Sequence, residues 1–213
     1  MHDAICSLMS SKLVSLLVAW VAVFAAHSDA APLANDRYGH MHTKYEKTIL
    51  GVDVANVDVW FDEATRDRIR IERLVQRYSD QVAERIARAA LEAGDVNVQV
   101  QLLRRAPFKQ FLDAVHDNLE HARDAGYISQ STFATAWANV QRDFAPLADR
   151  GFKKGDRLVY RARPGALQTT VTSGDRVLLD VTTPDENARR SMIASYFAPG
   201  SDFRKGLIKD VFE

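Results

Sequence analysis

The chain has 213 residues, of which 46% are hydrophobic and 26% charged, and its 28 basic and 28 acidic residues give a formal net charge of zero. A chain of this length buries roughly 70% of its unfolded surface, so one domain can form a sizeable core without disulfides or a structural metal. The balanced charge gives no overall electrostatic footprint for nucleic acid or for an acidic membrane, and argues against both as partners.

The first 30 residues have the pattern of a secretory signal peptide. Lys12 precedes the uncharged apolar run Leu13–Ala26, and small residues at −3 and −1 mark a cleavage site before Ala31. The run is shorter than the about 20 apolar residues of a membrane-spanning helix, so a membrane-tethered N-terminus is the less favoured alternative. We therefore expect a periplasmic or secreted protein with no stable membrane insertion after cleavage.

Cleavage there would leave a mature chain with 27 basic and 26 acidic residues, a net charge of +1. The only cysteine, Cys6, lies within the predicted signal peptide, so neither disulfide nor thiol chemistry is expected afterwards. Residues 31–45 show no hydrophobic period and predict a flexible lead-in. A single domain is then expected over residues 46–213.

The predicted domain begins with a strand followed by charged helices. Apolar residues alternate over 47–61 but change phase at Ala55–Asn56, which predicts a β-bulge there. Arginines alternate with acidic residues over 62–78, which favours a solvated, ion-paired helix face over a binding surface. Ser79 is expected to cap a helix over Asp80–Ala93.

The remainder alternates between strand and helix patterns. The strict apolar–polar alternation of Val96–Arg105 predicts a strand with one buried face. Helices are expected over 107–125 and 129–149, and their aromatic stripes indicate core packing. Turn residues then separate three short strands that form an antiparallel meander. Two C-terminal helices follow, with predicted caps at Thr183 and Ser201. The pattern predicts an α+β fold.

Few residue patterns suggest chemistry. The sequence contains no GxSxG elbow, Walker loop or dinucleotide fingerprint, so hydrolase, NTPase and Rossmann functions have no support. His40 and His42 could share a metal on one strand face, but no third ligand is adjacent in the sequence. His116, Glu120 and His121 do not form an HExxH pattern and predict a polar helix surface. We expect neither a metal nor a cofactor.

Arg104, Arg105 and Tyr160 are the candidate ligand-binding residues. Adjacent strand residues point to opposite faces, so one of the two arginines could face a cleft and pair with a ligand carboxylate. If buried without a ligand, it would need Asp113 or Asp156 as its partner. Alternatively, both arginines lie at the sheet edge with their charges in water. Tyr160, in the middle of a predicted strand, offers an apolar ring with a polar tip.

Three segments together resemble the chalcone isomerase-like superfamily, in particular its secreted bacterial branch. They are Glu46–Phe61 (EKTILGVDVANVDVWF), Val98–Val115 (VQVQLLRRAPFKQFLDAV) and Gly151–Phe212, which contains FKKGDRLVYRARPG and SYFAPGSDFRKGLIKDVF. The resemblance implies a curved antiparallel sheet with helices packed on one face and an apolar cleft between them. Plant members of this superfamily close a chalcone into a flavanone, whereas other members only bind fatty acids.

The sequence departs from the catalytic residues that the resemblance implies. No threonine lies between Gly51 and Phe61, the helix over Pro107–Ala125 has no tyrosine, and Asn118 is not in register with the family's asparagine. The cyclisation needs a polarised ketone and a held phenolate. We therefore expect a periplasmic, non-catalytic binding protein for a small apolar ligand such as a fatty acid. An isomerase or lyase with a non-standard active site is the alternative, and a structural partner protein is a third interpretation; the oligomeric state stays open.

Overall fold

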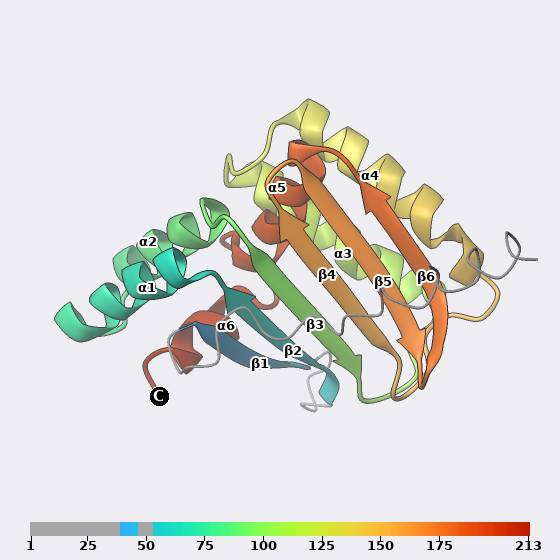
Figure 1. Cartoon of the computed structure of the whole chain (residues 1–213), viewed down its shortest axis with the longest axis horizontal. Coiled ribbons are helices and arrows are strands. Elements are labelled where there is room, and N and C mark those ends of the chain that lie inside the picture. Colours follow the sequence, from blue (N-terminus) through green and yellow to red (C-terminus); the bar gives the residue numbers. More distant parts are fainter. Residues whose placement is uncertain (1–38, 47–52) are drawn as a thin grey trace, which may run out of the picture. The chain divides into compact units, whose positions relative to one another are not determined.

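The structure is a computed structural model that describes residues 39–46 and 53–213. Its centre is an open, six-stranded antiparallel sheet whose strands lie in chain order (Figure 1). The strands are β1 (His40–Glu46), β2 (Asp53–Phe61), β3 (Val96–Leu102), β4 (Arg157–Arg163), β5 (Ala166–Ser173) and β6 (Arg176–Thr183). The predicted α+β class with an antiparallel sheet is therefore confirmed.

Helices occupy the long connections and the C-terminal end. The pair between β2 and β3 is α1 (Glu63–Val75) and α2 (Asp80–Leu91); the pair between β3 and β4 is α3 (Phe108–Asp124) and α4 (Gln130–Phe144); and α5 (Glu186–Phe197) and α6 (Arg204–Asp210) follow β6. The larger helices α3, α4 and α5 lie on one face of the sheet, as predicted (Figure 1). None of the helices in the described part of the chain is long and apolar enough to cross a membrane.

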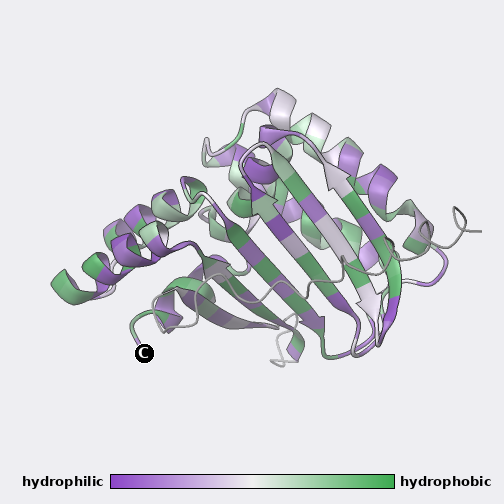
Figure 2. Cartoon of the chain, in the orientation of Figure 1, coloured by the Kyte–Doolittle hydropathy of each residue, from purple (hydrophilic) through white to green (hydrophobic). Residues whose placement is uncertain are grey.

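Alternating side chains give the sheet one apolar face and one polar face, visible as alternating bands in Figure 2. Strand pairing brings one helix-facing residue of each strand into a continuous row across the sheet: Met41, Val59, Val98, Tyr160, Thr169 and Val181. This register places Tyr160 on the side covered by helices. Because successive side chains of a strand point to opposite faces, the strand register decides which face each residue occupies.

The prediction of a flexible lead-in over residues 31–45 is wrong for its last part. Residues His40–Glu46 form edge strand β1, which pairs with β2 along its length. Met41 is fully buried, and α6 packs so closely on this strand that a side chain at Gly206 would collide with Thr43. The segment lacked a clear period because polar Thr43 lies on the helix-facing side between Met41 and Tyr45. Residues 31–38 and the predicted signal peptide lie outside the described residues.

The predicted bulge exists, one residue earlier than expected. Tyr45 pairs with Ala55 and Glu46 pairs with Asp53, so Val54 is the extra residue on β2. Both Val54 and Ala55 are buried. The pairing of β2 with β3 continues without a shift. The bulge therefore absorbs the change of phase on the side of β1 only.

Two predicted boundaries differ for local reasons. Strand β3 ends at Leu102, three residues before the predicted end, because the Leu102 and Leu103 amides bond to the Asp156 and Val54 carbonyls as the chain turns away. Helix α5 is capped by Asp185, which accepts from the Asn187 amide, and not by Thr183, which still belongs to β6.

Candidate functional site: an apolar pocket between the sheet and three helices

A pocket lies between the helix-facing side of the sheet and helices α3, α4 and α5. Its volume is about 160 Å³, and its walls come from all three helices, from all six strands, and from Phe152 and Phe203. The amphipathic stripes of α3 and α4 turn aliphatic and aromatic side chains towards the sheet. An apolar ligand would therefore contact apolar atoms on every side.

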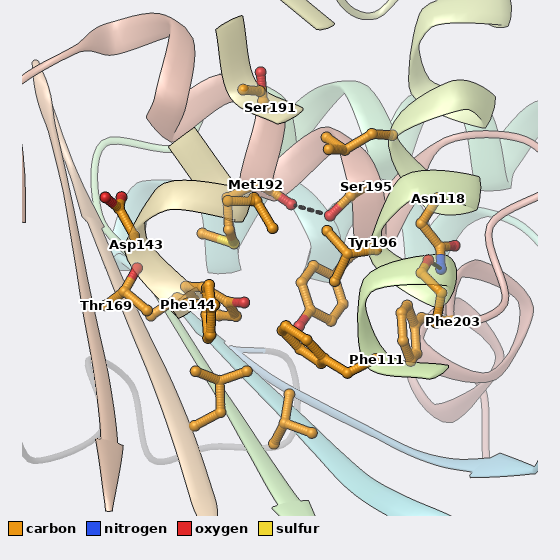
Figure 3. Close-up of a pocket in the computed structure, with 18 of the residues that line it drawn as sticks. Phe111, Asn118, Asp143, Phe144, Thr169, Ser191, Met192, Ser195, Tyr196 and Phe203 are labelled. Carbon is orange, nitrogen blue, oxygen red and sulfur yellow. Dashed lines mark hydrogen bonds between the residues drawn. The ribbon is translucent and has the colours of Figure 1, made fainter. Parts of the chain in front are cut away.

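Two aromatic clusters form much of the wall. One runs from Tyr45 through Phe203 and Tyr196 to Tyr160, with ring centroids 5.2, 4.8 and 6.5 Å apart. The other joins Phe111 to Phe144 at 4.9 Å and to Phe152 at 4.5 Å. Figure 3 shows Tyr196, Phe111 and Phe144 around the same part of the pocket. Rigid rings of this kind keep a cavity open more readily than flexible side chains do.

The first cluster contains three tyrosines, and the hydroxyl of one of them, Tyr45, interacts with Asp202. Neither Tyr160 nor Tyr196 has a hydrogen-bond partner for its hydroxyl among the described residues. Burial raises the pKa of Tyr160 above its usual value, and burial with the neighbouring Tyr160 raises the pKa of Tyr196 further. Both phenols therefore stay neutral at ordinary pH and can donate a hydrogen bond to a ligand oxygen.

Three more polar groups border the pocket. The Ser191 hydroxyl is buried and has no hydrogen-bond partner among the described residues. Thr169 is next to Tyr160 across the β4–β5 pair. Asp143 is paired with exposed Arg142 at 2.8 Å and is itself only 12% exposed. Figure 3 places Asp143 and Thr169 at one end of the pocket and Asn118 and Phe203 at the other.

Asn118 lines the pocket, but its side-chain amide is engaged in hydrogen bonds that stabilise the fold. Its amide nitrogen donates to the Ala114 carbonyl at 2.8 Å, and its amide oxygen accepts from the Asp202 backbone amide at 3.1 Å. These bonds attach the α5–α6 loop to α3. The catalytic asparagine implied by the resemblance therefore has no free counterpart here.

Of the three residues predicted to bind a ligand, Tyr160 lines the pocket and the two arginines do not. Arg104 and Arg105 are exposed in the turn after β3. They miss the pocket because the strand that was expected to aim them ends at Leu102. Asp156 does not pair with either arginine, since it pairs with Arg150 at 2.6 Å.

The histidines belong to other surfaces. His40 and His42 both bond to one carboxylate oxygen of Asp58 at 2.9 Å, on the polar face of the sheet. Burial alone would raise the pKa of Asp58, but the bonds from the two histidines outweigh it and hold the pKa below its usual value. His116 packs edge-on against Trp137 with ring centroids 4.9 Å apart. Its ring nitrogen is 3.7 Å from Glu120 along the same helix.

The sequence interpretation missed Tyr196, Ser191 and Asp143 as pocket residues. Tyr196 was recognised as part of an apolar helix stripe, and a tyrosine in such a stripe was a usable signal because its hydroxyl must end in a polar or open place. Ser191 and Asp143 gave no comparable signal. Helices α4 and α5 face the same pocket only after tertiary packing.

No protein-family model and no curated protein matches the sequence. Among solved structures, a fatty-acid binding protein from Arabidopsis thaliana matches with a TM-score of 0.52 over 86% of this chain and 94% of that chain, at 13% sequence identity. That protein has the chalcone isomerase fold. This chain therefore has a chalcone isomerase-like fold. The secreted bacterial branch remains a prediction from the sequence.

Proposed function

We propose that this chain is a non-catalytic binding protein for a small, largely apolar ligand related to a fatty acid. The observation that carries the proposal is the pocket itself, which is almost entirely apolar and includes the two unpartnered phenols of Tyr160 and Tyr196. An engineered apolar cavity of about 150 Å³ holds benzene. The cavity of about 160 Å³ therefore suits a single ring or an acyl chain of short to medium length.

The chemistry of the pocket favours binding over catalysis. A phenol with a raised pKa is a hydrogen-bond donor and not a base, and both Tyr160 and Tyr196 are in that state. The side-chain amide of Asn118 is engaged in structural hydrogen bonds. The plant protein of similar fold is a fatty-acid binding protein, which supports the proposal by analogy of fold.

We extend the proposal to the location of the protein: the signal pattern of residues 1–30 supports export to the periplasm or beyond.

The ligand's head group is predicted to be uncharged. No lysine, arginine or histidine is among the described residues that line the pocket, whereas Asp143 is. A ligand carboxylate would lose its hydration in the pocket without gaining a cationic side chain as a partner, and this desolvation would oppose binding. A hydroxyl or ester oxygen could accept from the tyrosines at a smaller cost.

A competition assay tests the function and the head group together. A fluorescent acyl probe is bound to the delipidated protein and displaced by the acid, the alcohol and the methyl ester of one medium-length chain. We expect the alcohol or ester to displace the probe at concentrations severalfold lower than the acid requires. R104M and R105M, which alter exposed residues outside the pocket, should bind like the wild type. Absence of binding by all three compounds, combined with turnover of a chalcone, would instead favour the isomerase alternative.

A further inference from the structure

The end of the α1–α2 hairpin carries an exposed apolar surface. Five large hydrophobic side chains are exposed in the described part of the chain, and four of them lie within eight residues: Ile71 at 60%, Leu74 at 63%, Val75 at 72% and Tyr78 at 36%. The fifth, Val177, is on β6. Single exposed apolar residues are ordinary, but a contiguous group of this kind usually marks an interaction site.

The spacing of these residues puts them on one side of the helix. Ile71, Leu74 and Val75 follow the i, i+3, i+4 pattern. Tyr78 lies beyond the end of α1, and its ring packs edge-on against Phe212 with ring centroids 5.9 Å apart. Ile69, two residues before Ile71, is fully buried. Residues two apart on a helix point in nearly opposite directions. Helix α1 therefore has two apolar faces, one packed in the core and one turned outward.

Arginines border the outward face. Arg70 lies beside this face and Arg77 follows the end of α1, whereas Arg73 lies nearer the buried side, where its Nε atom is buried. None of these three arginines has an acidic partner in the described residues. Other charges of the hairpin are paired: Arg66 with Glu63 at 3.0 Å, Arg68 with Glu92 at 2.9 Å, and Arg85 with Glu72 at 2.9 Å. The ion pairs predicted from the sequence thus form at Arg66, Arg68 and Glu72 but not at the other three arginines of this segment.

We propose that residues 70–78 dock on a membrane surface that carries anionic lipid headgroups. The side chains of Ile71, Leu74 and Val75 enter the boundary between headgroups and acyl chains, and Arg70 and Arg77 reach the phosphates on their flexible stems. Residues 70–81 contain three arginines and two acidic residues, Glu72 and Asp80, and Glu72 is paired with Arg85, so the local charge is positive although the chain as a whole is neutral. Figure 1 shows α1 and α2 extending together beyond the sheet, which leaves this end accessible to a flat surface.

The proposal is independent of the ligand in the pocket, and a fluorophore attached at the hairpin tests it locally. The full chain carries one cysteine, Cys6, so a polarity-sensitive dye is placed on V75C in a C6S background, with V177C as the matched control. Vesicles of phosphatidylcholine, with or without phosphatidylglycerol, are added. We expect a blue shift at position 75 on the anionic vesicles, a weaker shift at higher salt, and no shift at position 177.

A charge variant completes the test. R70Q/R77Q should lower affinity for the anionic vesicles by on the order of tenfold or more at low salt. Its thermal melting should match the wild type, because neither arginine has an acidic partner among the described residues. The proposal is overturned if position 75 gives no shift, or gives the same shift on neutral vesicles. It is also overturned if the shift follows protein concentration without lipid, which would indicate a second copy as the occupant.

Discussion

Two tyrosines, Tyr127 and Tyr160, differ in whether their hydroxyl groups have hydrogen-bond partners. The hydroxyl of Tyr127 donates to Glu84 at 2.7 Å and accepts from Arg204 at 3.2 Å, so it joins α2, α6 and the α3–α4 loop. The hydroxyl of Tyr160 faces the apolar pocket and has no partner among the described residues. A buried hydroxyl without a partner costs stability. Tyr160 is therefore a candidate for ligand contact, and Tyr127 is a structural residue.

Removing each hydroxyl separates the two roles. Y160F should weaken binding of the ester or alcohol by about fivefold to tenfold, since one hydrogen bond is worth roughly 1 kcal/mol, while the melting temperature stays equal or rises. Y127F should leave binding unchanged and lower the melting temperature. Probe displacement and thermal melting measure the two effects. Normal ligand affinity in Y160F would show that Tyr160 only fills space.

At the scale of elements, one residue, Asp156, helps to join three strands of the sheet, β3, β4 and β5. Asp156, whose side chain is 1% exposed, accepts from Arg150 at 2.6 and 3.0 Å and from the Lys153 amide at 2.8 Å. Its backbone carbonyl accepts from Leu102 at the end of β3. Arg150 also donates to Ser173 at the end of β5. The start of β4 is thereby fixed to both of its neighbours.

This carboxylate should make stability depend on pH. Burial alone would raise the pKa of Asp156, but the bonds from Arg150, Lys153 and Ser173 outweigh it and lower the pKa below 3.8. A lowered folded-state pKa means that the stabilisation is complete above the unfolded-state pKa and is lost as pH falls through the folded-state value. Unfolding at neutral pH and under acid conditions, measured side by side, should show this loss.

D156N leaves Arg150 without its partner, so it should cost about 3 kcal/mol at neutral pH. The penalty should shrink as the pH falls below 3.8 and through the lowered pKa of the folded carboxylate. The control D113N changes an exposed carboxylate paired with Lys109 and should cost less than about 1 kcal/mol. Equal penalties for D156N at neutral and acid pH would contradict the linkage.

At the scale of the whole molecule, one sheet separates two surfaces with different chemistry. The helix-covered face contains the pocket, and the other face carries polar side chains such as the His40–His42–Asp58 group. The α1–α2 hairpin forms a third surface, where Ile71, Leu74 and Val75 are exposed beside Arg70. A ligand-binding function and a membrane-docking function would therefore use separate parts of the protein.

Export can be checked on the whole chain. If the signal peptide is cleaved as proposed, protein isolated from the extracytoplasmic fraction should begin at Ala31 and contain no cysteine. N-terminal sequencing and intact mass measure this directly. A full-length chain confined to the cytosol would contradict the proposed location. The argument that the mature protein lacks a thiol would then fail as well.

The sequence by itself determined the order and type of nearly every element, because hydrophobic periods of 2 and 3.6 residues are local properties. It also placed Tyr160 in the middle of a strand. Tertiary structure decided the rest. It made β1 a strand through pairing with β2, ended β3 before Arg104, and brought Tyr196 from α5 to Tyr160 on β4. These outcomes depend on packing between residues far apart in the chain, and no local pattern records which distant side chains will meet.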